Sequence, residues 1–297
     1  MNIGYFNAQG INNIEHWYSL EIKELLNRGH EVRIFWLKGN QPTKEDIDWI
    51  DVAHFHYAHV ADYYKRIGVP FIISPHAHDI WRDNGATLKR ASSHKNCKAV
   101  TYQSFYHKKK FEEWGIDKPL VHLPMCCRTE IFKRQTPYNP NGGLVAGGRL
   151  IPKKGLDRLK GVENLTIFGD GPLKEPLQET FGGQVKFTGY LAGTELKELF
   201  EKSSIYLFPA ITTLDGDSDG IPNTIKEAML MELPVIASPI AGIPELENVS
   251  ILSDWNSIND ILKDYHKEPN TKGRKEILNS FSPEICVDKI LNIIWNI

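Results

Sequence analysis

Two cations and several glycines stand close together in the middle of the chain. Residues 147–155 read GGRLIPKKG and directly follow a short apolar run that has the character of a strand. Arg149 offers a planar fork of N–H donors and Lys154 a compact positive charge, and both suit phosphate oxygens. Gly148 would let a ligand approach the backbone closely. With a helix start behind them, these residues predict a diphosphate clamp, and the alternative is that both cations are solvated surface charges.

A second glycine motif follows another apolar run. Phe168 is succeeded by Gly169, Asp170, Gly171 and Pro172. Proline is common in the first turn of a helix, so the motif predicts a strand, a tight turn and a helix. Taken alone, it fits an ordinary strand-to-helix turn as well as it fits a ligand-binding loop.

The longest motif occupies residues 208–245. An acidic loop at residues 215–220, with sequence DGDSDG, is followed by Ile221, Pro222 and an amphipathic stretch that begins near Asn223. The backbone N–H groups of Asn223, Thr224 and residue 225 would point from the start of this helix toward a bound anion. The motif therefore predicts a second contribution to anion binding.

Two acids flank that helix start. Glu227 lies one turn into the helix and could accept two hydrogen bonds from a ribose diol. Asp219, at the junction of loop and helix, could reach a sugar hydroxyl. The alternative is that Asp219 caps the helix and Glu227 is a surface charge.

Together these motifs resemble the nucleotide-binding domain of retaining glycosyltransferases with the GT-B fold, specifically glycosyltransferase family 4. That family typically shows G-R-L-x-x-x-K-G, then G-x-G-P, then E-G-x-P followed by E-A-M, and then G-I-P-E. The corresponding segments here are residues 148–155, 169–172, 219–229 and 242–245. Residues 28–32, 51–56 and 129–132 in the N-terminal half are also similar to the family, so the resemblance covers nearly the whole chain.

The resemblance implies a role for each matching residue. Arg149 and Lys154 would bind the diphosphate. Asp219 stands at the first of the family's paired acids and would contact the donor sugar, and His76 would lie near the C6 hydroxyl of that sugar. These four form the expected catalytic set. The expected donor-binding residues are Gly10, Gly148, Gly169, Gly171, Tyr190, Gly220, Ile221, Pro222, Asn223, Thr224 and Glu227.

Three positions depart from the family pattern. Asp219 is one methylene shorter than the usual glutamate, so it reaches less far toward the sugar. Glu232 stands where glycine is usual, and residues 125–128, with sequence MCCR, replace the usual N-G-V-D. We expect the last two departures to lie outside the catalytic set.

These motifs are positioned by short apolar runs that alternate with amphipathic stretches. The predicted strands are residues 2–6, 32–37, 52–56, 71–74 and 99–102, and then 144–147, 165–168, 185–188, 205–208, 234–237 and 250–252. Repeated strand–helix units predict parallel sheets covered on both faces, with ligands at the carboxyl ends of the strands.

The stretch at residues 135–143, QTPYNPNGG, has the composition of a linker between two such sheets. The predicted fold class is therefore α/β with GT-B architecture, in which two Rossmann-like domains face each other across a cleft. We expect an acceptor-side N-terminal domain at residues 1–138 and a nucleotide-sugar-binding domain at residues 139–282. The C-terminal helix at residues 283–297 would pack back on the N-terminal domain.

Composition indicates a soluble globular protein. The 297 residues are 41% hydrophobic and 24% charged, and the net charge is −2. Residues 1–139 hold 19 Lys and Arg against 15 Asp and Glu, and residues 140–297 hold 16 against 22. No strongly basic stripe exists, which argues against a nucleic-acid partner. We read no signal peptide or membrane span, and four cysteines without C-x-x-C spacing fit a reducing cytoplasm.

Two segments allow competing interpretations. His54, His56 and His59 could bind zinc, but no acidic or cysteine partner stands at useful spacing, and we favour histidines that line a cleft. The segment from Phe105 to Trp114 mixes lysines with aromatic residues. It could make weak contact with the inner membrane surface, which would make the protein peripheral there, but an ordinary solvated helix face is favoured.

The function that the resemblance implies is that of a retaining hexosyltransferase (EC 2.4) in polysaccharide biosynthesis. It would move a hexose-type sugar from a UDP- or GDP-linked donor to a hydroxyl of a glycan, lipid-linked or small-molecule acceptor. No cofactor and no metal would be required, because the departing diphosphate would help to deprotonate the acceptor. Two alternatives stay open: a non-catalytic sugar-nucleotide-binding protein, and another GT-B enzyme such as a sugar-nucleotide epimerase.

Overall fold

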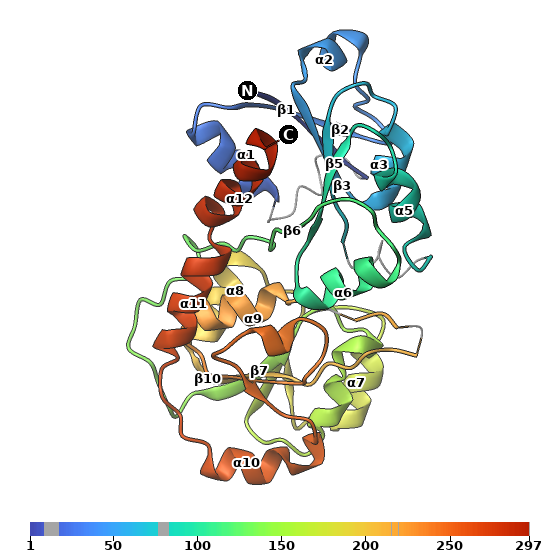
Figure 1. Cartoon of the computed structure of the whole chain (residues 1–297). Coiled ribbons are helices and arrows are strands. Elements are labelled where there is room, and N and C mark those ends of the chain that lie inside the picture. Colours follow the sequence, from blue (N-terminus) through green and yellow to red (C-terminus); the bar gives the residue numbers. More distant parts are fainter. Residues whose placement is uncertain (9–17, 77–82, 215, 219, 297) are drawn as a thin grey trace. The chain divides into compact units, whose positions relative to one another are not determined.

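The computed structural model describes residues 1–8, 18–76, 83–214, 216–218 and 220–296 (Figure 1). Gly10 and Asp219 lie outside the described residues. The chain divides into two compact units, one formed by residues 1–127 with 280–297 and the other by residues 128–279. We call them unit 1 and unit 2.

Unit 1 contains a six-stranded parallel sheet in the order β2-β1-β3-β4-β5-β6. Its strands are β1 (Asn2–Asn7), β2 (Glu31–Trp36), β3 (Val52–His56), β4 (Phe71–Ser74), β5 (Cys97–Tyr102) and β6 (Leu120–His122). Its helices are α1 (Tyr18–Asn27), α2 (Lys44–Trp49), α3 (Ala58–Tyr64), α5 (Ala86–Ser92), α6 (Phe105–Glu113) and α12 (Pro283–Trp295). Every residue of β3 and β4 is buried, as expected for central strands covered on both faces.

The two faces of this sheet support two cores, because successive side chains of a strand point to opposite faces. Phe6 of β1 packs with Phe55 and Phe71 in one cluster. The preceding residue, Tyr5, packs in the other cluster, together with α1 and with Ile290 of α12. The C-terminal helix therefore completes the second core of unit 1, and Figure 1 shows it beside α1.

Unit 2 contains a second six-stranded parallel sheet, in the order β12-β11-β10-β7-β8-β9. Its strands are β7 (Gly143–Gly147), β8 (Leu165–Phe168), β9 (Lys186–Phe187), β10 (Ser203–Phe208), β11 (Val235–Ala237) and β12 (Ser250–Ile251). Its helices are η2 (Pro152–Lys154), η3 (Leu156–Leu159), α7 (Lys174–Phe181), α8 (Gly193–Glu201), α9 (Asn223–Leu230), η4 (Ile243–Glu245), η5 (Trp255–Ser257) and α10 (Ile258–Asp264). Helix α11 (Thr271–Phe281) leads from unit 2 into unit 1.

All eleven predicted strands are present, with ends that differ by at most two residues. Strand β6 was not predicted, since three residues beside two prolines carry little periodic signal. The stretch at residues 135–143 is held against unit 2. The Glu201 carboxylate accepts the N–H groups of Gln135 and Thr136, and the Tyr138 hydroxyl donates to the Ser204 carbonyl. The division between the units accordingly falls at residue 127 rather than at residue 138.

The basic and aromatic stretch at residues 105–114 forms α6. Lys108 and Lys110 pair with Glu112 and Glu113 at 3.5 and 2.8 Å, as on an ordinary solvated helix face. No helix in the described part of the chain is long and apolar enough to cross a membrane.

Candidate nucleotide-binding site

Two glycine loops lie against each other where the neighbouring strands β7 and β8 end. The Gly148 N–H donates to the Phe168 carbonyl at 3.1 Å, and the Leu150 N–H donates to the Asp170 carbonyl at 2.8 Å. A Cβ atom on Gly169, whose φ is +116°, would fall 1.8 Å from the Gly148 carbonyl oxygen. Only glycine allows this approach, so the first two sequence motifs form one continuous backbone surface.

The two predicted cations stand on this surface in different environments. Arg149 is exposed directly after the glycine pair. Lys154, at the end of η2, is half-buried, with its Nζ 5.0 Å from the centre of the Phe208 ring at the end of β10. A Cβ on Gly148 would lie 3.9 Å from the same Nζ, so the ammonium lies beside the glycine loop. A planar donor fork and a point charge thus flank a backbone that can approach an anion.

The acidic loop is attached to the same region by a third cation. Lys153 Nζ lies 3.1 Å from Asp217 Oδ1, and the Ile211 N–H donates to the Lys153 carbonyl. Ser218, which directly follows Asp217, is buried, and Gly220 is half-buried. These contacts hold the loop that leads to α9 close to η2.

Helix α9 begins without a side-chain cap. Its N-cap residue is Pro222, whose side chain accepts no backbone N–H. The half-buried Ile221 precedes it. Asn223 Oδ1 is buried and has no hydrogen-bond partner among the described residues. Orphan N–H groups and the positive end of the helix dipole make such a start suitable for an anion.

Tyr206 connects the helix start to the first glycine loop. Its buried hydroxyl lies 2.8 Å from Thr224 Oγ1 and 3.3 Å from the Gly147 carbonyl. The carboxyl ends of β7, β8 and β10 and the start of α9 therefore form one site within unit 2. The sequence motifs do not predict Tyr206, because a tyrosine in the middle of a buried strand gives no signal beyond core packing.

Glu227 is buried rather than a surface charge, with only 5% of its surface exposed. Its Oε1 accepts a hydrogen bond from Arg128 Nη2 at 3.2 Å. Burial raises the pKa of Glu227 and the neighbouring Arg128 opposes that rise. Arg128 belongs to the MCCR run that departs from the family pattern and that we placed outside the catalytic set. The structure puts it in direct contact with Glu227, which is a predicted donor-binding residue.

Tyr190 follows β9 and is 63% exposed. The carbonyl of Gly189 before it accepts the Gly169 N–H at 2.7 Å, which places this turn at the second glycine loop. Gly171 lies against the first glycine loop, since a Cβ on it would lie 2.6 Å from the Leu150 carbonyl oxygen. The unit 2 residues predicted for donor binding that the structure describes therefore gather at one sheet edge.

His76 lies in unit 1, two residues after β4, and is 8% exposed. Gln103 Nε2 lies 2.7 Å from its Nδ1 and 3.5 Å from the Pro75 carbonyl, and His56 Nδ1 lies 3.4 Å from its Nε2. His54 and His56 are fully buried on β3, where burial lowers the pKa of His54 to about 3. His76 therefore stands at the end of a buried row of imidazoles at the carboxyl edge of the unit 1 sheet.

The segment that contains these loops is similar to known glycosyltransferases. Residues 148–262 match the family described as glycosyl transferases group 1. The amylovoran biosynthesis glycosyltransferase AmsK of Erwinia amylovora is 35% identical over 137 residues, which are 44% of this chain and 32% of that protein. The putative colanic acid biosynthesis glycosyltransferase WcaL of Salmonella typhimurium is 31% identical over 118 residues, or 35% of this chain and 29% of that protein. The chain spans about a third of the length of these relatives.

Solved structures match nearly the whole chain. Sucrose-phosphate synthase from Thermosynechococcus elongatus aligns with a TM-score of 0.78 at 15% identity and covers 99% of this chain and 98% of its own. HepE from Anabaena, solved in complex with UDP, aligns with a TM-score of 0.78 at 15% identity over the full length of both chains. The predicted GT-B fold, with its two Rossmann-like parallel sheets, is confirmed. Its unit 2 carries the segment that is similar to group 1 glycosyltransferases.

Proposed function

We propose that the chain is a glycosyltransferase that moves a hexose-type sugar from a nucleotide diphosphate sugar to an acceptor hydroxyl. The similarity of residues 148–262 to group 1 glycosyltransferases supports this class. The observation that carries the proposal is the joining of the two glycine loops, Lys154 and the uncapped start of α9 at one sheet edge. A diphosphate needs this combination of close backbone approach, positive charge and outward N–H groups.

In this proposal the positive charges of the site would act on the leaving group. As the bond to the anomeric carbon breaks, negative charge grows on the diphosphate, and Arg149 and Lys154 would stabilise it without reorganising. The Glu227 carboxylate would hold the ribose hydroxyls. We propose transfer with retention of anomeric configuration and without a metal, with the departing diphosphate assisting removal of the acceptor proton.

We further propose a uridine diphosphate hexose as the donor and a growing polysaccharide as the acceptor. The first point is supported by HepE, which was solved with UDP and with UDP-glucose. The second is supported by the relatives that serve amylovoran and colanic acid biosynthesis.

The test begins with Lys154→Ala and Arg149→Ala in the full chain. Release of UDP from UDP-glucose should fall by about 10²–10³-fold in each variant, as for removal of a group that stabilises developing charge. Lys160→Ala is the matched control, since Lys160 is exposed on the same segment beyond η3. Circular dichroism and thermal melting check that each variant folds. Unchanged turnover in folded Lys154→Ala would refute the assignment, and a wild-type chain that binds UDP-glucose without releasing UDP would be a binding protein.

A further inference from the structure

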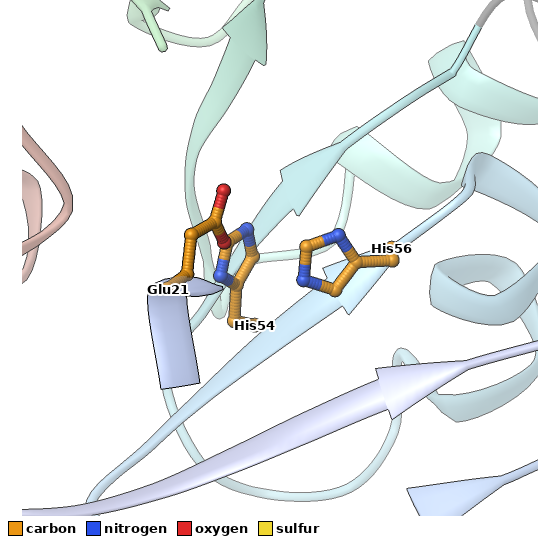
Figure 2. Close-up of side chains that lie close together, drawn as sticks. All are labelled: Glu21, His54 and His56. Carbon is orange, nitrogen blue, oxygen red and sulfur yellow. The ribbon is translucent and has the colours of Figure 1, made fainter. Parts of the chain in front are cut away.

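Unit 1 contains a cluster of metal-ligating side chains that the proposed sugar transfer does not use. Glu21 comes from α1, and His54 and His56 come from β3. Each offers one ligand atom, and these atoms all lie within 4.8 Å of one another. Figure 2 shows the Glu21 carboxylate beside the His54 ring, with the His56 ring next to it.

All three side chains are removed from solvent, with relative exposures of 2% or less. The one hydrogen bond to the Glu21 carboxylate among the described residues comes from the Tyr5 hydroxyl, at 3.2 Å to Oε2. His54 Nδ1 is buried and has no hydrogen-bond partner among them. Burying a polar atom without a hydrogen-bond partner costs free energy of folding, so core packing alone does not explain why these side chains are polar.

The outer nitrogen of each imidazole is already held in place. His54 Nε2 lies 2.7 Å from Ser74 Oγ, which in turn lies 2.7 Å from Thr101 Oγ1. His56 Nδ1 faces His76 Nε2 at 3.4 Å, and its Nε2 is buried. Metal-bound histidines characteristically use their second nitrogen in this way, which fixes the ring orientation and the tautomer.

We propose that Glu21, His54 and His56 bind a divalent transition-metal ion, with zinc as the best fit. Two imidazoles and one carboxylate are a ligand set that zinc uses, with a fourth position for water. Ligand atoms at about 2.0 Å from a tetrahedral ion lie about 3.3 Å from one another. Binding of the ion therefore requires the three side chains to rotate so that their ligand atoms move by about 1 Å. The ion would join α1 to β3 within unit 1 and is not assigned to the transfer chemistry.

The spacing in the sequence hides this site. His54 and His56 suggest zinc on their own, but the acidic partner stands 33 residues earlier, on the buried face of a helix. The fold supplies the partner that the sequence pattern lacked, because α1 packs against β1 in the same cluster as Tyr5.

The experiment measures zinc retained by the purified full chain without a histidine tag. The protein is incubated with zinc chloride, desalted and analysed by elemental mass spectrometry. The wild type should retain about one zinc per chain, and chelation should lower its melting temperature by several degrees, since a ligand that binds only the folded state stabilises it.

Two variants and a control locate the ion. Glu21→Gln keeps an acceptor for the Tyr5 hydroxyl and nearly the same volume, so it should fold, but it loses the anionic ligand and should retain at least tenfold less zinc. His54→Gln should retain none, while His94→Gln, which removes a unit 1 histidine outside the cluster, should match the wild type. Tetrahedral absorption bands on cobalt loading should appear in the wild type and vanish in Glu21→Gln.

Two results would overturn the proposal. One is a wild-type chain that retains no zinc and melts at the same temperature with and without chelator, which would leave the space to a buried water. The other is folded Glu21→Gln that retains as much zinc as the wild type, because the ion would then lie elsewhere.

Discussion

At the scale of single residues, the buried Glu227 carboxyl has a pKa that burial and a neighbouring arginine shift in opposite directions. A carboxylate with 5% exposure pays a large desolvation cost, and this cost raises its pKa. Arg128 donates to Oε1 at 3.2 Å and lowers the pKa again. A ribose hydroxyl binds more strongly to a carboxylate than to a neutral acid, so under the proposed function Arg128 would act as a positioning residue for the nucleoside.

Arg128→Ala should therefore weaken UDP binding by at least tenfold, about 1.4 kcal/mol, because Glu227 would lose its counter-charge and take up a proton. Titration calorimetry with UDP measures the effect. The weakening should be larger at pH 6 than at pH 8, since burial raises the pKa of Glu227 and a larger share of the carboxyl is protonated at the lower pH. Lys133→Ala is the control, because Lys133 is exposed in the same segment. Equal UDP affinity in the wild type and in folded Arg128→Ala would contradict this role.

At the scale of elements, much of the fold follows from the sequence, because buried parallel strands appear as short apolar runs that end in glycine or polar residues. Residues 52–56, 71–74 and 165–168 were predicted with both ends correct. The glycine loops and the start of α9 could also be predicted, since their chemistry is local. Arg128 and Tyr206 could not, because their roles depend on partners 99 and 18 residues away.

One departure from the family pattern now has a structural meaning. Glu232 follows α9 with a φ of +60°, in the left-handed region. The Leu233 N–H donates to the Ala228 carbonyl, which closes the helix end as expected for a residue in that conformation. Glycine adopts this conformation without strain, which explains why the family prefers it there.

Helix α6 carries a buried histidine that should make unit 1 sensitive to acid. His107 is 1% exposed, its Nδ1 lies 3.2 Å from Ser104 Oγ, and its Nε2 has no hydrogen-bond partner among the described residues. Burial lowers the pKa of His107 to about 4. The unfolded chain, with a histidine pKa of about 6.5, then binds a proton that the folded chain excludes between pH 6.5 and pH 4.

The contribution of the neutral His107 to the free energy of unfolding is therefore fully present above pH 6.5 and is lost as the pH falls toward 4. His107→Phe fills the site without titrating, so the drop in the free energy of unfolding between pH 7 and pH 5 should shrink by about 2 kcal/mol. Urea unfolding at the two pH values measures the difference. Identical drops in the wild type and the variant would show that His107 does not cause the sensitivity.

At the scale of the whole molecule, the chain leaves unit 1 after residue 127, builds unit 2, and returns through α11 to place α12 in unit 1. Cys286, Val287, Ile290 and Leu291 of α12 are buried in the cluster that contains Tyr5 and Leu25. The last residues of the chain therefore complete a core that its first residues begin. The glycine loops and α9, by contrast, belong wholly to unit 2.

This arrangement should separate the stability of unit 1 from the proposed nucleotide binding in unit 2. Ile290→Ala should lower the free energy of unfolding of unit 1 by about 2–5 kcal/mol, because it leaves a cavity at a fully buried position. Amide exchange should speed up in β1, β3 and α1, while the affinity of unit 2 for UDP stays within twofold of the wild type. Asn292→Ala, at an exposed position of the same helix, should change neither quantity by more than about 0.5 kcal/mol. A parallel loss of UDP affinity in Ile290→Ala would contradict this independence of the two units.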